Sequence, residues 1–138
     1  MKGKELLDAN PLAAKIITDW YYNQMLESLN TNDVPNEFKE FVKSQAVDNE
    51  TVGRIIDLNP RSLFDVLDEN ELFIDVLHRN SEYWVSINGF SFNTYKYSKR
   101  KEADFESIKV AIKLLNDKLE NNERQDSGTS DTEIPTEE

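Results

Sequence analysis

Residues 83–94 read Tyr-Trp-Val-Ser-Ile-Asn-Gly-Phe-Ser-Phe-Asn-Thr, and this stretch decides the fold class. Asn88 and Gly89 are the preferred residues of a two-residue type I′ turn, because both tolerate positive φ. Apolar and polar residues alternate on each side of the pair, which is typical of half-buried strands. The stretch therefore predicts an antiparallel hairpin that turns at positions 88 and 89.

The two sides of this hairpin differ in polarity. The opposed pairs on one side are Ile87 with Phe90, Val85 with Phe92, and Tyr83 with Thr94. Five of these six residues are apolar or aromatic, so we expect this side to be buried. The other side carries Trp84, Ser86, Ser91, Asn93, Tyr95 and Tyr97. We expect that side to be polar and exposed, with a stripe of aromatic rings.

An amphipathic helix is predicted after the hairpin, from a cap at Ser98 to about Asn121. Its apolar residues recur at helical spacing and are Phe105, Ile108, Ile112, Leu115 and Leu119. This face should pack on the apolar side of the hairpin. Residues 122–138 hold six acids against one base and lack large apolar residues until Ile134. This acidic tail is predicted to stay disordered, because it buries too little to offset its ordering entropy.

The first 70 residues predict a bundle of short helices. After a short lead-in, Asn10 is expected to cap a helix that starts at Pro11 and runs to about residue 29. A second helix should run from 35 to 45 with Phe38, Phe41 and Val42 inward. A third should cover 49–58 with a cap at Asp48 or Asn49, and a fourth should open at Asn59-Pro60 and continue through Leu67. Gly53 lies inside the third helix, where close packing of another element would explain it.

The stretch 71–79 is too densely apolar for periodicity to decide between a strand and a buried helical turn. A strand is favoured, because a hairpin follows and three strands are more stable than two. The order of elements then predicts an α+β fold with a small antiparallel meander. We expect a single domain over residues 1–121, followed by the tail.

Composition limits the classes of function. The chain has 138 residues, a formal net charge of −11 and no cysteine, which excludes disulfides and Cys-based zinc sites. It shows no signal peptide and no apolar run long enough for a membrane span, so we expect a soluble cytoplasmic protein. An acidic surface repels nucleic-acid phosphates at long range. This argues against general DNA or RNA binding and leaves imitation of nucleic acid open.

No catalytic constellation is apparent in the sequence. His78 is the only histidine, and no nucleophile motif surrounds any serine. The carboxylates of Asp65, Asp68 and Glu69 occur at helical offsets away from the apolar residues, which indicates a solvated face. We therefore predict no cofactor and no metal, and we interpret His78 as a partly exposed residue at the end of an element.

One basic cluster stands out, and it consists of Lys96, Lys99, Arg100 and Lys101. It lies beside the predicted aromatic stripe, and cations next to exposed rings suit a protein contact or single-stranded nucleic acid. Positive charge at the start of a helix is unfavourable with the helix dipole, which hints at another role. The predicted contact patch consists of Trp84, Tyr95, Tyr97, Lys99 and Arg100.

The segment from Trp84 to Leu119 resembles the end of small phage-encoded proteins of unassigned function. The similarity lies in the hairpin, the run Tyr97-Ser-Lys-Arg-Lys-Glu-Ala and the helix that ends in a Leu-Leu…Lys-Leu-Glu pattern. The run Asn59-Pro-Arg-Ser-Leu-Phe-Asp adds to it. The resemblance covers about a third of the chain. It implies a phage-type, non-enzymatic accessory role and transfers no functional residue.

Three hypotheses about function follow. The first is a non-enzymatic accessory factor, assembly helper or modulator that binds another protein. The second is a module that binds or imitates nucleic acid. The third is an enzyme that uses carboxylates and a divalent metal. The sequence assigns neither the partner nor the oligomeric state.

Overall fold

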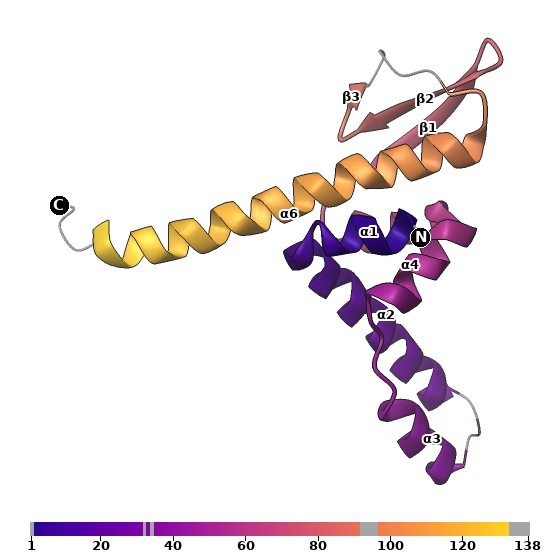
Figure 1. The fold of residues 1–138 in the computed structure, drawn as a ribbon, viewed down its shortest axis with the longest axis vertical. Coiled ribbons are helices and arrows are strands. Elements are labelled where there is room, and N and C mark those ends of the chain that lie inside the picture. The colour runs from indigo at the N-terminus through magenta and orange to yellow at the C-terminus, as the bar shows by residue number, and fades with distance from the viewer. Residues whose placement is uncertain (1, 32, 34, 92–96, 133–138) are drawn as a thin grey trace.

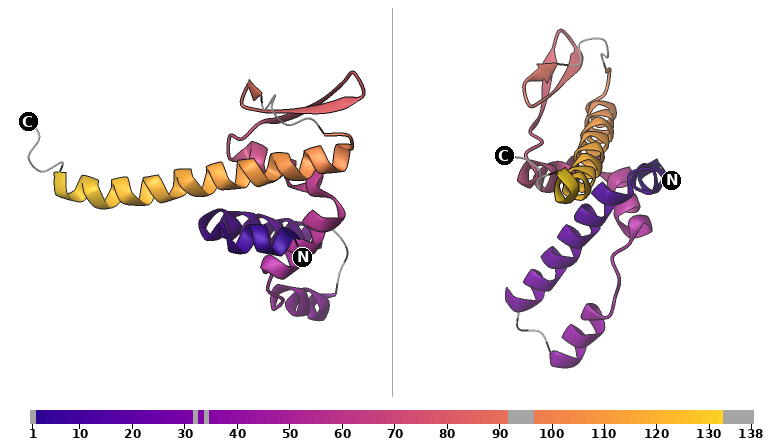
Figure 2. Two further views of the ribbon diagram at one scale, coloured as in Figure 1. Left: turned by 45° about the horizontal axis from the view of Figure 1, so that its top comes forward. Right: turned by 90° about the vertical axis from the view of Figure 1, so that its left-hand side faces the viewer.

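The α+β fold predicted from the sequence is confirmed, and it is arranged in three layers around the last helix. A computed structural model describes residues 2–31, 33, 35–91 and 97–132, with the backbone alone at 30, 31, 90, 91 and 124–132. The last helix lies between a small antiparallel sheet on one side and the N-terminal helices on the other (Figures 1 and 2). No helix within the described residues has the length and apolarity to span a lipid bilayer.

The described residues form six α-helices, one 3₁₀ helix and three strands. The first four helices are α1 (Lys2–Asp8), α2 (Pro11–Thr31), α3 (Asn36–Lys43) and α4 (Asn49–Leu58). They are followed by η1 (Pro60–Leu63), α5 (Phe64–Glu69), β1 (Ile74–Arg79), β2 (Glu82–Ile87), β3 (Phe90–Ser91) and α6 (Arg100–Thr132). The helix predicted from Asn59-Pro60 is therefore present, with its first turn wound as 3₁₀.

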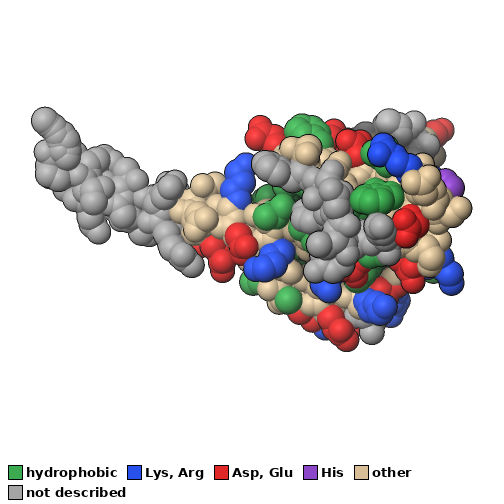
Figure 3. All heavy atoms as spheres, turned by 90° about the horizontal axis from the view of Figure 1, so that it is seen from above, with side chains coloured by type: hydrophobic (Ala, Val, Ile, Leu, Met, Phe, Trp, Pro, Cys, Tyr) green, Lys and Arg blue, Asp and Glu red, His purple; other side chains and the backbone are tan. Residues whose placement is uncertain are grey.

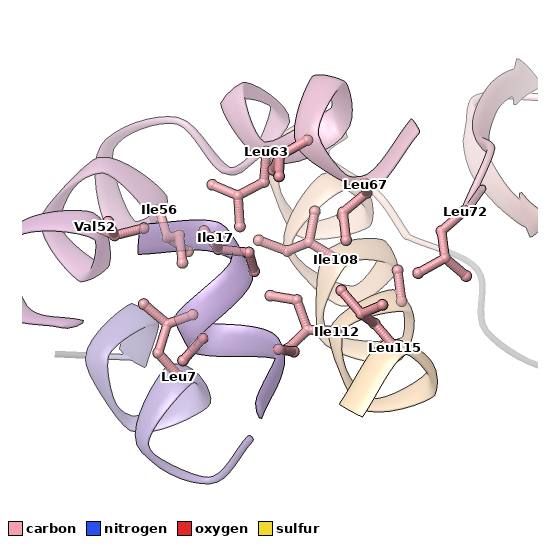
Figure 4. Packing of buried hydrophobic residues seen from close by; sticks show 14 of the residues in the cluster. Leu7, Ile17, Val52, Ile56, Leu63, Leu67, Leu72, Ile108, Ile112 and Leu115 are labelled. Atoms are coloured by element: carbon pink, nitrogen blue, oxygen red, sulfur yellow. The ribbon is translucent and has the colours of Figure 1, made fainter. Parts of the chain in front are cut away.

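The core forms where α6 contacts both outer layers. Its fully buried side chains include Leu7, Ile17, Val52, Ile56, Leu63, Leu67, Ile108 and Ile112 (Figure 4). Val85 and Ile87 of β2 are buried against the same cluster. The prediction that the last helix packs on the apolar side of the hairpin is thus confirmed.

The sheet has the order β1-β2-β3, and β1 runs antiparallel to β2. The favoured strand in 71–79 is confirmed from Ile74 onward. Asn88 and Gly89 have φ of 51° and 86°, and Ile87 pairs with Phe90, so the predicted turn and its first pair are confirmed. A second two-residue turn joins β1 to β2 at Asn80 and Ser81, both with positive φ, and the sequence analysis did not identify it.

The far end of the hairpin has a different register from the predicted one. Tyr83 forms a bridge with Tyr97, not with Thr94. Tyr83 is four residues from Ile87 along β2, whereas Tyr97 is seven residues from Phe90 along the returning chain. Because paired residues share a side, Tyr97 lies on the core side with Tyr83, and both pack against the core. The prediction that Tyr97 faces outward is therefore wrong. Phe92, Asn93, Tyr95 and Lys96 lie outside the described residues, so the predicted pair of Val85 with Phe92 stays a prediction.

The predicted burial of α3 is also wrong. Phe38 and Phe41 are 53% and 61% exposed, and Val42 is half-buried. No described helix or strand packs broadly against this face of α3. The helix is held instead near its end, where the Tyr22 hydroxyl of α2 donates a 2.9 Å hydrogen bond to the carbonyl of Lys43.

The start of α2 is capped by a side chain of α6, which is distant in the sequence. The side-chain oxygen of Asn116 on α6 accepts hydrogen bonds from Leu12 N at 2.9 Å and Ala13 N at 3.1 Å. The side chain of Asn10, the predicted cap, donates instead to Leu6 O at the end of α1. Because α1 ends directly before α2, Asn10 is within reach of a carbonyl in the last turn of α1, and such terminal carbonyls lack helical partners.

Two helix ends bear on the remaining predictions. Asp48 caps α4 by accepting from Thr51 N at 2.9 Å, so one of the two predicted caps is confirmed. The last helix ends at Thr132, later than the predicted end near Asn121, and no proline interrupts the chain before Pro135. Residues 133–138 lie outside the described residues, and the disorder of the tail stays a prediction for them.

Candidate functional site

A cleft of about 730 Å³ lies at the start of α6. It forms where the beginning of α1, the end of α4 and η1 meet the first turns of α6. Its lining residues are Lys2, Ile56, Asp57, Pro60, Tyr97, Lys99, Lys101, Glu102, Phe105 and Glu106. Residues from the start of the chain, from its middle and from the beginning of α6 therefore converge on one surface.

Two glycines place the start of α1 beside the end of α4. A Cβ on Gly3 would lie 2.4 Å from Gly53 O, and a Cβ on Gly53 would lie 2.6 Å from Lys4 N. The backbones cross at this close approach because neither residue has a side chain, as expected for Gly53. The amide of Gly3 also donates a 2.8 Å hydrogen bond to Asp57 Oδ1. The Asp57 carboxylate thus accepts a hydrogen bond from the first turn of α1 and also lines the cleft.

A partly buried ion pair fixes the first turns of α6 against η1. The Arg61 guanidinium donates from Nη2 to Asp104 Oδ1 at 2.8 Å and from Nε to Oδ2 at 3.1 Å. Asp104 is only 4% exposed, and the bidentate contact supplies the partner that a buried carboxylate needs. The same guanidinium lies 4.7 Å from the ring centroid of Phe64. This anchor determines how Pro60 and Phe105 lie relative to each other in the cleft.

The floor of the cleft is apolar. Ile56 and Pro60 are fully buried, and Tyr97 and Phe105 are half-buried with their rings packed against the core. Such a concave apolar surface with a few polar groups at its edge is the usual form of a ligand pocket. It can accept an apolar side chain of modest size.

Two basic side chains at the rim of the cleft have no ionic partner among the described residues. Lys99 and Lys101 are exposed, and neither forms an ion pair with any residue the structure describes. The Lys2 ammonium lies 5.8 Å from the centroid of the Phe105 ring. In a chain of net charge −11, these three lysines gather at one edge of a cleft whose lining also includes Asp57, Glu102 and Glu106. Such an edge attracts a carboxylate that approaches together with an apolar group.

The acidic residues of the rim have nearby partners. Glu102 accepts from the Ser98 hydroxyl at 3.5 Å, and Glu106 lies 4.0 Å from the ammonium of Lys109. Together with Asp57, which is bonded to Gly3, these carboxylates are engaged within the chain. Lys99 and Lys101 are the charged lining residues that have no such contact among the described residues, so they are the ones available to pair with a ligand.

The structure divides the contact patch predicted from the sequence. Tyr97 and Lys99 line the cleft, whereas the Arg100 guanidinium lies over the ring of Tyr83, 5.2 Å from its centroid. Trp84 is half-buried on the opposite side of the sheet, where it pairs with Leu77. Tyr95 is outside the described residues. Figure 3 views the molecule from the sheet side, where basic, acidic and apolar side chains are interspersed.

The rings near the basic cluster are engaged in contacts within the protein. Tyr83 stacks on His78 at a centroid distance of 4.6 Å and an interplanar angle of 23°, and it also contacts Arg100. A ring with these neighbours is a poor platform for a nucleic-acid base. His78 is exposed in β1, next to the last residue of the strand, which confirms its predicted place at the end of an element.

Sequence reasoning missed most of the cleft. Phe105 was assigned to the core by its spacing, and Lys2 belonged to a stretch expected only as a lead-in. Ile56 carried no signal beyond burial, and Pro60 none beyond the start of a helix. The pair of glycines at positions 3 and 53 was the available hint, because two glycines in helical patterns can mark a close crossing of backbones.

The predicted run of carboxylates lies apart from the cleft. Asp65, Asp68 and Glu69 are exposed on α5, as expected for a solvated face. The Glu69 carboxylate accepts a 2.9 Å hydrogen bond from the indole of Trp20. Among the described residues, no three histidine, aspartate or glutamate side chains are grouped in a way that suits a metal ion.

No family model, curated protein or solved structure matches this chain. The chemistry of the cleft is accordingly judged from its own residues, above all from the apolar floor and the two lysines at the rim.

Proposed function

We propose that this chain is a cytoplasmic, non-enzymatic accessory protein that binds another protein through the cleft at the start of α6. The observation that carries the proposal is the pairing of an apolar floor with Lys99 and Lys101, which have no ionic partner among the described residues. This combination fits a segment of the partner that presents an apolar side chain flanked by carboxylates.

The charge distribution supports selectivity. The chain carries a net charge of −11, so an acidic protein is repelled at long range unless it approaches the lysine edge. A bound carboxylate would share its charge with two ammonium groups in a partly desolvated cleft, where an ion pair is screened less than in bulk water. Apolar contact with Phe105 and Tyr97 would supply most of the affinity, and the lysines would determine orientation.

The test compares two charge-reversed variants in affinity capture from the native host, followed by mass spectrometry. One variant carries Lys99→Glu with Lys101→Glu. The matched control carries Lys15→Glu with Lys113→Glu, which changes two exposed lysines outside the cleft by the same charge. The proposal expects a protein that the unchanged chain and the control retain and that the cleft variant loses.

Calorimetric titration with that purified protein then gives the size of the effect. We expect binding by the Lys99→Glu, Lys101→Glu variant to be weaker by about tenfold or more, or about 1.4 kcal/mol. Its melting temperature should stay unchanged, because both residues are exposed. Equal capture by the cleft variant would refute the proposal. A salt-sensitive mobility shift of single-stranded DNA that disappears in the same variant would favour nucleic-acid binding instead.

A further inference from the structure

The outer edge of β1 is open. Among the described residues, the sheet ends at β1, and no strand pairs with the edge that faces away from β2. Leu77 lies in the middle of this strand and is 51% exposed, as is Phe73 just before it. β1 contains neither proline nor glycine, the residues that commonly interrupt an unpaired edge.

The backbone of β1 offers hydrogen-bonding groups at alternate residues. Asn88 N donates to Phe73 O at 2.9 Å, which fixes Phe73 as a residue whose polar groups face the β2 side. In an antiparallel ladder every second residue points its backbone amide and carbonyl to the same side, so those of Asp75, Leu77 and Arg79 also face β2. The amides and carbonyls of Ile74, Val76 and His78 therefore point toward the open edge.

We propose that this edge binds the β1 strand of a second copy of the chain, antiparallel about a two-fold axis at Leu77. In this register, Val76 of one copy exchanges backbone hydrogen bonds with His78 of the other. Leu77 lies opposite Leu77, and Asp75 lies opposite Arg79 on both sides of the axis. The two sheets join into one, and the contact is isologous, as in most homodimers.

Charge complementarity selects this register. Asp75 and Arg79 are both exposed, and neither forms an ion pair with a described residue. A two-fold axis at Asp75 or at Arg79 would place like charges opposite each other. An axis at Val76 or at His78 would place each charge opposite an uncharged side chain. Only the axis at Leu77 places each charge opposite its complement, in directly opposed pairs whose side chains are close.

The apolar residues agree with the same arrangement. Leu77 lies on the side of the sheet away from α6, beside the half-buried Trp84 of β2. Pairing at the axis brings the two copies of Leu77 together and continues an apolar strip between the two Trp84 side chains. An edge protected against association usually carries charges that repel across it. Here one acid and one base are spaced so that they attract.

Sedimentation equilibrium over a wide range of concentrations tests the charge pairs. The unchanged chain should rise from the monomer mass of 16.0 kDa toward twice that value. Asp75→Arg should remain monomeric, because it places two arginines opposite each other at both ends of the contact. The double variant Asp75→Arg, Arg79→Asp exchanges the charges and should dimerise again. Melting temperatures confirm that each variant folds.

A disulfide trap tests the register, because the chain contains no cysteine. At a non-hydrogen-bonded pair the Cα atoms are about 4.5 Å apart, within reach of a disulfide. Leu77→Cys should therefore form a covalent dimer under mild oxidation. Two controls should not: Asp75→Cys, whose copies are about 13 Å apart along the strands, and Leu114→Cys, an equally accessible site on α6 that is 45% exposed.

Three results would overturn the proposal. They are a monomer at every concentration, a charge exchange that does not restore the dimer, and a Leu114→Cys disulfide that forms as fast as the one at position 77. The Lys99→Glu, Lys101→Glu variant should dimerise like the unchanged chain, because the cleft plays no part in this contact. Failure of the dimer and failure of the proposed function are thereby separated.

Discussion

The two neighbouring helices α3 and α4 carry similar amphipathic patterns and have opposite environments. In α4, Val52 and Ile56 are completely buried, whereas in α3 Phe38 and Phe41 are more than half exposed. Phenylalanine, like valine and isoleucine, is among the residues most often buried in proteins, so residue type alone does not explain the difference. The comparison teaches that periodicity predicts which side of a helix can be buried and leaves open whether a partner covers it.

The difference arises from what each helix meets. Gly53 lets α1 approach the backbone of α4, and Asp48 caps the first turn of that helix. The start of α3 has Pro35 in the cap position and no side-chain hydrogen bond there. Its contact with α2 includes the bond from the Tyr22 hydroxyl. α4 is thus built into the core, and α3 is attached to the side of α2 (Figure 1).

Truncating one apolar residue in each helix tests the difference in burial between α3 and α4 most directly. Ile56→Ala should lower the free energy of unfolding by about 2–5 kcal/mol, because it leaves a cavity in a fully packed site. Phe41→Ala should change it by less than about 0.5 kcal/mol, as for exposed positions. Urea denaturation measures both values. A loss at Phe41 as large as that at Ile56 would show that α3 is packed in solution.

A smaller effect is expected at the crossing of α1 and α4. Gly53→Ala adds a methyl group against the backbone of Lys4, and such overpacking costs about 1–3 kcal/mol. This exceeds the gain of about 1 kcal/mol from the higher helix propensity of alanine. Arg54→Ala, at the next and exposed residue, should cost less than about 0.5 kcal/mol. Equal thermal stability of the two variants would contradict the close crossing.

The attachment of α3 is tested by removing one hydroxyl group. Tyr22→Phe deletes the hydrogen bond to Lys43 O, which contributes about 0.5–1.5 kcal/mol. We expect faster amide hydrogen exchange in α3 and unchanged exchange in α4. Tyr21→Phe is the matched control, because its hydroxyl bonds to Ser62 in η1. Faster exchange in both helices of the Tyr22 variant would show that α3 and α4 unfold together.

The smallest expected effect is a pH dependence of the α4 cap. Hydrogen bonds from the Thr51 amide and hydroxyl hold the pKa of Asp48 below its ordinary value of 3.8. Because the folded state prefers the carboxylate, this contribution to stability is complete above pH 3.8 and is lost as the pH falls through the lowered pKa. Asp48→Asn keeps a cap that does not titrate. In urea denaturation below pH 3.8, that variant should lose less stability than the unchanged chain.

Local patterns in the sequence were enough to predict much of the fold. The turn at Asn88 and Gly89, the cap at Asp48 and the apolar face of α6 depend on residues close together in the chain. The register at Tyr97 was mispredicted because it depends on additional residues in the returning chain, which alternation cannot reveal. The cap at Asn116 could not be predicted, since its acceptor lies about a hundred residues from the amides it serves.

The candidate site was predictable only in part, for the same physical reason. Lys99 and Tyr97 were found because they are neighbours in sequence. Lys2, Pro60 and Phe105 join them through the glycine crossing and the Arg61–Asp104 ion pair, which are contacts between distant segments. Trp84 was grouped with them by sequence distance and lies on the other side of the sheet. Proximity in the chain is a poor guide to a surface that three layers build together.

The cap that Asn116 provides has a consequence for synthesis of the chain. The first turn of α2 has its amides satisfied only after residue 116 has left the ribosome and α6 has docked. Until then, the N-terminal helices lack both this cap and the apolar seam that Ile108 and Ile112 complete. The nascent chain therefore reaches its native packing only after the last helix has docked.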